Sequence, residues 1–237
     1  MRIAFLSDIH ANIDAFRAVL DVIDKETIDK IYIAGDLIGY YYHPDKVIDI
    51  CMARDDIRCI KGNHDQNFLK GLSDEDFMTK MIEKYGSSYR IAKEKLSEKQ
   101  INWLRNLPSK LEFTVEQVSI TIAHGSIHSE DEYVYPSKTN TELINQLSDS
   151  EYTVLGHTHY PFFWCKENKW LVNPGSVGQP RDQGALASFF YLDLKNKTLQ
   201  PRKSRFPLDK LFKEIIKNDP NKNYLKNVFI RWQRSEY

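Results

Sequence analysis

The feature that most constrains this chain is a series of polar clusters, each placed directly after a short apolar run. The clusters are flanked by small residues and are rich in residue types that bind metals. Five of the seven histidines of the chain lie in them. An isolated histidine at a strand end is ordinarily a packing or surface residue, whereas an ordered series of this kind is not explained by packing. In chain order the clusters are Ser7-Asp8-Ile9-His10, Gly35-Asp36, Gly62-Asn63-His64-Asp65, Ala123-His124-Gly125 and Gly156-His157-Thr158-His159.

The apolar runs before the first three clusters have the composition of buried strands. They cover residues 2–6, 30–34 and 57–60. A helical pattern over 13–23 and a helix beginning at Pro44 separate them. This alternation of strand and helix is typical of a parallel sheet. Since ligands of open α/β sheets gather at the carboxyl ends of the strands, we expect the clusters to converge in one crevice.

The rest of the chain has a different pattern. Residues 66–107 are predicted to be helical and polar, a second helix is predicted over 139–147, and an amphipathic helix follows Pro207. Residues 221–237 fit either a helix or a strand. Strand-like segments prevail between these helices, at 118–122, 152–155, 162–164 and 186–192.

Composition narrows the class of protein. A chain of 237 residues suits one sizeable α/β domain. Its 33 basic residues balance 33 acidic ones, so no overall field attracts it to nucleic acid or to a membrane surface. Three cysteines without C-x-x-C spacing exclude a thiolate zinc site and indicate a reducing compartment. Because the first apolar run is too short for a secretory signal, we expect a cytoplasmic protein without a membrane or stable nucleic-acid partner.

The chemistry of the clusters indicates a metal centre. Alternate residues of an extended segment project the same way, so Asp8 and His10 can face one site, as can His157 and His159. Imidazole mixed with carboxylate suits manganese, iron, cobalt, nickel or zinc better than calcium. Seven candidate ligands are too many for one tetrahedral ion and fit two divalent ions, with Asp36 as the natural bridge. These ligands are Asp8, His10, Asp36, Asn63, His124, His157 and His159.

The ordered clusters resemble the signature of the calcineurin-like metallophosphoesterase superfamily, which runs D-x-H, G-D, G-N-H-D/E, H and G-H-x-H. The resemblance implies an α/β fold, a four-layer α/β/β/α sandwich of two mixed β-sheets flanked by helices. It implies a metallophosphoesterase domain over residues 1–206, in which 66–107 are a possible helical cap over the crevice. Residues 207–237 would be a C-terminal helical extension of the same domain.

The resemblance also assigns roles. One metal would be held by Asp8, His10, Asp36 and His159, and the other by Asp36, Asn63, His124 and His157. A hydroxide bridging the two metals would attack phosphorus in line, without a covalent enzyme intermediate. His64 would not be a ligand: it would contact the phosphate and protonate the leaving oxygen as a general acid.

Departures from the pattern point to one branch of the superfamily. Protein phosphatases carry an aspartate and an arginine three and four residues after the G-D aspartate, where this chain has Gly39 and Tyr40. Because that bidentate arginine is missing, the sequence disfavours a protein phosphatase. It also disfavours a symmetrical dinucleoside tetraphosphate hydrolase, since those enzymes share the arginine-containing pattern. The complete G-H-T-H block and the run over residues 173–181 resemble the small prokaryotic phosphodiesterases instead. A phosphodiesterase acting on a small phosphoester or nucleotide-type substrate is therefore predicted.

Three residues are candidates for contacts with the substrate: Asn63, Tyr40 and Arg181. A ring of the run Tyr40-Tyr41-Tyr42 can stack on a nucleobase or aryl group, although packing of the loop with phenols facing solvent is the preferred interpretation. Arg181 can clamp a phosphate oxygen or pair with Asp182. His43 is predicted to cap a helix, and the three cysteines to be buried apolar residues.

Other functions stay open at this point. Within the same superfamily, the alternatives are a phosphomonoesterase and a protein or nucleotide phosphatase. In a different class, the chain would be a scaffold, which predicts lost ligands, or a regulatory module that holds a nucleotide without cleaving it. The sequence leaves the oligomeric state open.

Overall fold

The first apolar run forms β1 (Arg2–Leu6), the central strand of one sheet of the computed structural model, which describes residues 1–232. Residues 3–6 are fully buried, as expected for a strand covered on both faces. This sheet is mixed, because β1 pairs in parallel with β2 and antiparallel with β9. Its strands in spatial order are β10 (Thr198–Arg205), β9 (Leu186–Asp193), β1, β2 (Lys30–Ile33) and β3 (Ile57–Cys59).

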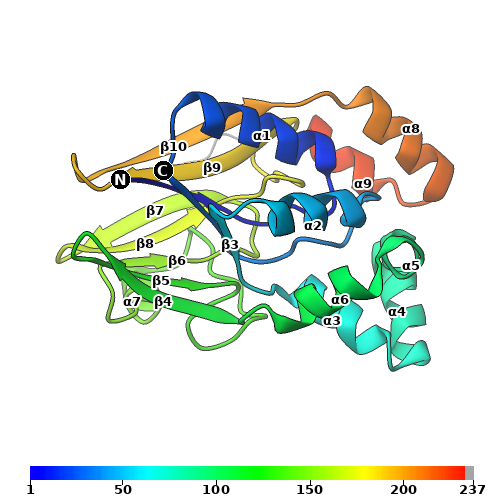
Figure 1. The fold of residues 1–237 in the computed structure, drawn as a ribbon, viewed down its shortest axis with the longest axis horizontal. Helices are drawn as coiled ribbons and strands as arrows, with labels where there is room; N and C mark the ends of the chain where they lie inside the picture. The colour runs from blue at the N-terminus through cyan, green and yellow to red at the C-terminus, as the bar shows by residue number, and fades with distance from the viewer. Residues whose placement is uncertain (233–237) are drawn as a thin grey trace.

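A second five-stranded sheet packs against the first (Figure 1). It is also mixed: β5 and β6 run parallel, as do β6 and β8, while its two edge strands pair antiparallel. An apolar core that includes Phe5, Ile120, Val154 and Phe190 fills the space between the sheets. In spatial order its strands are β4 (Lys110–Val115), β5 (Val118–Ala123), β6 (Tyr152–Val154), β8 (Lys169–Pro174) and β7 (Pro161–Lys166).

Helices cover the outer faces of both sheets, which confirms the four-layer α/β/β/α sandwich. Figure 1 shows α1 (Ile13–Lys25) above the first sheet and α7 (Asn140–Ile144) beneath the second. The side chain of Asn12 caps α1 by accepting a hydrogen bond from the N–H of Ala15. Helix α7 is shorter than the predicted 139–147, because the capping box of Thr139 begins it and the chain turns after Ile144.

The polar stretch after β3 is helical, as predicted. It forms four short helices beyond the end of the second sheet, at the lower right of Figure 1. Within the described residues, no helix is long and apolar enough to cross a membrane. The helices are α3 (Asn63–Gly71), α4 (Glu75–Tyr85), α5 (Ser88–Lys95) and α6 (Glu98–Asn106), while α2 (Pro44–Ala53) packs on the first sheet.

The C-terminal segment is helical. The predicted amphipathic helix is α8 (Asp209–Asn218), which buries Leu211 and Ile215. The stretch left open between helix and strand forms α9 (Tyr224–Asn227) and a 3₁₀ turn, η1 (Val228–Ile230). The remainder of that stretch, residues 233–237, lies outside the described residues.

The prediction of solvent-facing phenols after β2 is wrong. Tyr41 and Tyr42 are almost completely buried. The hydroxyl of Tyr41 donates to the carbonyl of Leu225 at 3.1 Å, and that of Tyr42 donates to Asp219 at 2.9 Å. The C-terminal helices therefore close over this loop and supply the acceptors that the buried hydroxyl groups need.

Two smaller predictions also need correction. His43 occupies the N-cap position of α2, yet its side chain makes no capping hydrogen bond and contacts Glu214 of α8 at 2.8 Å instead. Cys51 and Cys59 are buried, but Cys165 is exposed. The reason is topological, because Cys165 lies in β7, an edge strand of the second sheet.

Asp219 joins three separate segments, and its removal is expected to destabilise the fold. It accepts hydrogen bonds from Tyr42 and from both the N–H and the hydroxyl of Ser87. Replacing Asp219 by Ala leaves these donors buried without an acceptor, which costs about 2–4 kcal/mol of unfolding free energy. Urea denaturation of Asp219→Ala measures this loss. The exposed Asp149→Ala is the matched control, and equal stability of the two variants would contradict the assignment.

Candidate metal centre

The predicted ligands lie in loops at the carboxyl ends of the strands, and their backbones are unusual. Asp8, His10, Asp36, His157 and His159 all have positive φ, between 50° and 68°. Residues other than glycine rarely adopt this left-handed conformation, which costs about 1–2 kcal/mol each. Strain of this kind concentrates at functional sites, where the surrounding structure enforces it.

Glycines of the clusters let these loops approach one another. Gly35 has φ +89°, and a Cβ there would lie 2.8 Å from Nδ1 of His124. A Cβ on Gly62 would lie 2.1 Å from Oδ1 of Asp36. Any larger residue at either position would push the candidate ligands apart, which explains the glycines of the G-D and G-N-H-D clusters.

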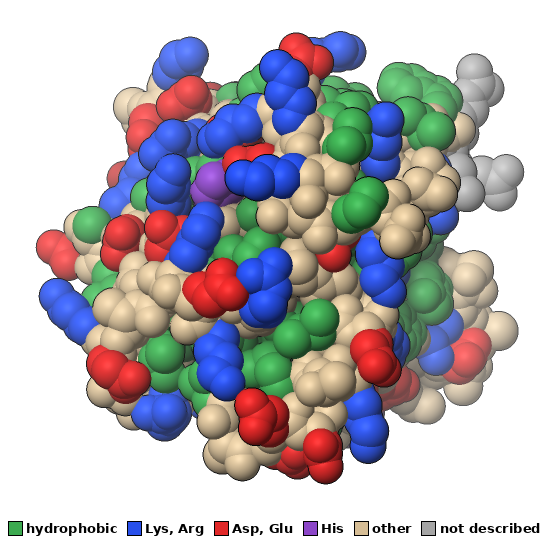
Figure 2. Space-filling model, turned by 90° about the vertical axis from the view of Figure 1, so that its right-hand side faces the viewer, with side chains coloured by type: hydrophobic (Ala, Val, Ile, Leu, Met, Phe, Trp, Pro, Cys, Tyr) green, Lys and Arg blue, Asp and Glu red, His purple; other side chains and the backbone are tan. Residues whose placement is uncertain are grey.

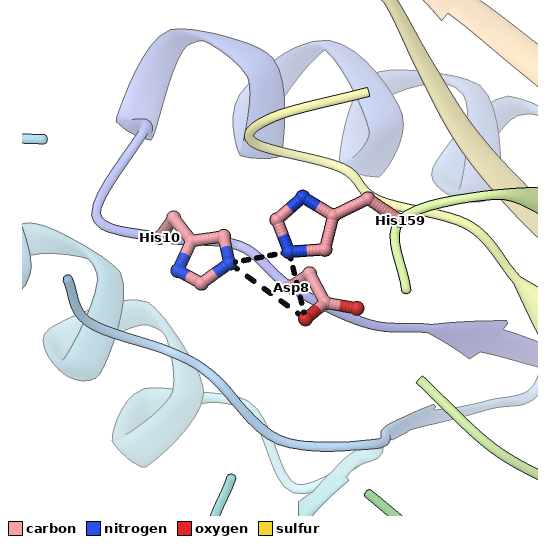
Figure 3. Close-up of side chains that lie close together, drawn as sticks. All are labelled: Asp8, His10 and His159. Carbon is pink, nitrogen blue, oxygen red and sulfur yellow. Dashed lines mark hydrogen bonds and ion pairs between the residues drawn. The ribbon is translucent and has the colours of Figure 1, made fainter. Parts of the chain in front are cut away.

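One group of candidate ligands consists of Asp8, His10 and His159 (Figure 3). The two Nε2 atoms of His10 and His159 lie 3.0 Å apart, and Oδ1 of Asp8 is 3.4 Å from Nε2 of His159. The Nδ1 atoms face the backbone carbonyls of Ile38 and Gln179 at 3.1 and 2.8 Å. These carbonyls can only accept, so they fix the imidazole protons on Nδ1 and direct both Nε2 lone pairs inward.

A second group consists of Asp36, His124 and His157. Nε2 of His124 lies 3.3 Å from Oδ2 of Asp36 and 2.8 Å from Oδ1 of Asn63. Its Nδ1 faces the carbonyl of Ala34 at 2.7 Å. The structure thus brings Asn63 to this group, as the sequence predicted.

Asp36 lies between the two groups. Its Oδ2 is 3.7 Å from Nε2 of His10 in the first group, in addition to its contact with His124 in the second. Its Oδ1 accepts a hydrogen bond from the N–H of His64 at 2.8 Å, which fixes the orientation of the carboxylate. Asp36 therefore faces both groups of candidate ligands.

The donor set fits divalent cations. Among the described residues, Oδ1 of Asp8 and Nε2 of His157 are buried without any hydrogen-bond partner. Buried polar atoms are normally satisfied, because leaving one unpaired costs about 1–3 kcal/mol. Two facing lone pairs at 3.0 Å also repel each other unless a cation or proton lies near both. Cations within the two groups would satisfy all of these atoms.

Electrostatics favour the protonation states that metal ligands require at Asp36, His10 and His157, but not at His124. Burial opposes ionisation of Asp36, but the surrounding histidines hold the pKa of its carboxyl well below the usual value. Burial lowers the pKa of His10 well below its usual value and that of His157 to about 4. At His124, burial is outweighed by the charge of Asp36, which raises the pKa to about 10. The raised pKa means that Nε2 of His124 carries a proton, which faces Oδ2 of Asp36 and Oδ1 of Asn63. A cation that binds between these atoms would compete with this proton.

His64 lies at the first turn of α3, beside the first group. Its ring centroid is 5.0 Å from that of His10. Its Nδ1 is 2.8 Å from the hydroxyl of Tyr89, which lies in α5 and is buried. Gly39 permits this position, because a Cβ there would lie 2.6 Å from Nδ1 of His64. Burial lowers the pKa of His64 to about 4.

The sequence did not predict the contacts of two residues near His64, Tyr89 and Asp65. Tyr89 lies in the polar helical stretch, and no local sequence pattern indicates that its hydroxyl contacts a histidine 25 positions earlier in the chain. Asp65 was predicted only as the last residue of the cluster Gly62-Asn63-His64-Asp65, without a role of its own. Its carboxylate accepts hydrogen bonds from the N–H groups of Leu37, Ile38 and Gly62 and so joins the loops after β2 and β3.

The two predicted substrate contacts outside the clusters, Tyr40 and Arg181, line a common cavity of about 420 Å³. The ring of Tyr40 lies 4.7 Å from that of His64. The alternative pairing of Arg181 with Asp182 is wrong, because Asp182 forms an ion pair with Lys203. Within residues 1–232, the guanidinium of Arg181 has no carboxylate partner.

The chain has relatives of similar length and fold among known proteins. The chain is 28% identical over 236 residues to an uncharacterised protein of Methanocaldococcus jannaschii, a match that covers 91% of this chain and 92% of that protein. A hypothetical protein of Pyrococcus horikoshii has a similar structure, with a TM-score of 0.84, 21% identity and coverage of 96% and 97%. A metallophosphoesterase of Sphaerobacter thermophilus follows with a TM-score of 0.75, 23% identity and coverage of 92% and 94%.

The family profile of the calcineurin-like phosphoesterase superfamily domain matches residues 1–197. This match spans both sheets up to the turn after β9, together with every candidate ligand. The protein is therefore a metal-dependent phosphoric ester hydrolase and belongs to the calcineurin-like phosphoesterase superfamily.

Proposed function

We propose that the chain is a two-metal phosphodiesterase acting on small phosphoesters of the nucleotide type. Two groups of buried donors with unpartnered atoms carry the proposal, since a single cation cannot satisfy both. Asp8, His10 and His159 would hold one cation, and Asn63, His124 and His157 the other, with Asp36 shared. Residues 1–206 would form the catalytic unit, with 66–107 as a cap and 207–237 as an extension.

The charge of the site suits phosphate esters. Two divalent cations exceed the charge of the carboxylates of Asp8 and Asp36, so the loaded site attracts an anion. When bound, the cations would supply Lewis acidity and lower the pKa of a water molecule to make it a nucleophile. The carbonyl-anchored imidazoles keep their Nε2 atoms aimed inward, so the donors need not reorganise during the reaction.

His64 would act as the general acid. Hydrolysis forms a bond from a water oxygen to phosphorus and breaks the bond from phosphorus to the leaving oxygen. The water loses a proton to solvent, and the imidazolium of His64 donates one to the leaving oxygen. Burial, together with the charges of His159 and His124, lowers the pKa of His64 to about 4, and the negative charge of a bound phosphoester would raise its affinity for the proton. The hydroxyl of Tyr89 would hold Nδ1, leaving Nε2 for the leaving group.

We expect a preference for diesters over monoesters. The position of the bidentate arginine is taken by Tyr40, whose buried ring packs on His64 and offers no cationic clamp for a dianionic monoester. With Mn²⁺ present, kcat/KM for bis-p-nitrophenyl phosphate should exceed that for p-nitrophenyl phosphate by about tenfold or more. Faster turnover of the monoester would replace this assignment by that of a phosphomonoesterase.

Removing the shared carboxylate should reduce metal content and activity together. In Asp36→Asn, one oxygen still accepts from the N–H of His64, but the negative charge between the groups is lost. Bound metal, counted by plasma mass spectrometry, should fall from two ions per chain to at most one. Activity should fall by about a hundredfold or more. Asp149→Asn is the control, and Asp36→Asn with two ions and full activity would contradict the bridging role.

Removing the general acid should spare the metals. His64→Ala is expected to bind two ions and to lose about a hundredfold or more in kcat. The loss should be smaller for a p-nitrophenyl diester, whose phenolate leaves readily, than for an alkyl diester, whose alkoxide needs a proton. Tyr89→Phe should lower kcat by a smaller factor and leave KM unchanged, with Tyr152→Phe as its control. Equal losses of His64→Ala on both esters would exclude proton donation.

A further inference from the structure

The cavity beside the first group has features that the proposed chemistry does not use. It measures about 420 Å³ and lies next to His64 rather than between the two groups. Ring centroids of Tyr40 and Tyr85 are 4.7 and 4.5 Å from that of His64. A group attached to the oxygen that His64 would protonate can therefore extend toward this cavity. Its lining includes Tyr40, Lys84, Tyr85, Arg181, Tyr224 and Arg231.

Aromatic rings from three distant segments meet in the cavity. Tyr40 follows β2, Tyr85 ends α4 and Tyr224 begins α9. The ring of Tyr40 lies 5.5 Å from that of Tyr85 and 6.5 Å from that of Tyr224, edge to face in both cases. Such rings offer apolar faces on which a planar group can stack.

The cavity is also cationic. Lys84, Arg181 and Arg231 line it, and among the residues that the structure describes no aspartate or glutamate does. Within residues 1–232, neither arginine forms an ion pair. Figure 2 shows the end of the molecule that carries α4 and α8, where acidic and basic side chains are interspersed on the surface. The charged residues described in the cavity lining are all basic, and a small enclosed set of this kind suits a small anion better than a long polyanion.

We propose that this cavity binds the leaving group of the substrate, and that the leaving group joins a planar ring to a separate negative charge, as a nucleotide does. The inference rests on the proposed function, in which His64 protonates the leaving oxygen. Stacking against a tyrosine face would hold the ring, and the three cations would hold the charge.

Segments outside the two sheets would thus determine specificity. Lys84 and Tyr85 come from the helical stretch 66–107, while Tyr224 and Arg231 follow residue 197, where the match to the family ends. Asp219 joins the same two segments through Ser87 and joins them to the loop of Tyr40 through Tyr42, which holds the walls of the cavity together.

Calorimetric titration of the full chain loaded with Mn²⁺ tests the inference without turnover. The probes are AMP, adenosine and ribose 5-phosphate, which carry the ring and the charge together or separately. AMP should bind about tenfold or more tightly than either fragment. Because binding is measured, the result does not depend on whether the chain hydrolyses diesters.

Variants separate the cavity from the metal centre. Lys84→Gln combined with Arg231→Gln should weaken AMP about tenfold and leave adenosine within twofold. Tyr85→Leu should weaken AMP and adenosine about fivefold and leave ribose 5-phosphate unchanged, whereas Tyr85→Phe keeps the ring and should bind as the parent does. Arg105→Gln, an exposed change on α6, is the control for charge.

Three results would overturn the inference. They are the absence of AMP binding, an effect of the charge variants on AMP below twofold, and unchanged adenosine affinity in Tyr85→Leu. Hydrolysis of diesters alongside any of these results would leave the proposed function standing and place the leaving group elsewhere. AMP binding without any hydrolysis of diesters would support the nucleotide site and contradict the proposed function.

Discussion

Three hydrogen bonds from imidazole Nδ1 atoms to backbone carbonyls determine how this site is built. They anchor His10, His124 and His159 to the carbonyls of Ile38, Ala34 and Gln179. A carbonyl can only accept, so each bond fixes a tautomer and turns Nε2 toward the interior. The bond of His124 joins the sheets, because His124 follows β5 of the second sheet and Ala34 follows β2 of the first. The two sheets must therefore pack in one register for the donors to meet. The packing of the sheets and the geometry of the site therefore depend on each other.

This geometry requires a strained backbone at several candidate ligands. Five candidate ligands have positive φ, and glycines fill the places where their loops touch. The core between the sheets and the hydrogen bonds to Asp65 hold the loops in this conformation. Cations that satisfy the unpartnered atoms of Asp8 and His157 would stabilise the same arrangement, so we expect metal binding and stability of the fold to be linked.

The convergence of the candidate ligands was predictable because its signals in the sequence are local. Asp8 and His10, two positions apart at the end of an apolar run, show both the strand and the direction of its ligands. Asp36 and the G-H-T-H block do the same elsewhere. The walls around the core were not predictable, since they depend on contacts between distant segments. Tyr41 and Tyr42 are buried only because α8 and α9 return over them, and Tyr89 reaches His64 only because α5 folds back.

The central claim is that two cations lie side by side in this crevice, and an anomalous difference map from crystals soaked in Zn²⁺ tests it most directly. The account predicts two peaks. One should lie within about 2.2 Å of ligand atoms of Asp8, His10 and His159, and the other within the same distance of Asp36, His124 and His157. A single peak, or peaks only on the surface, would contradict the shared two-metal site.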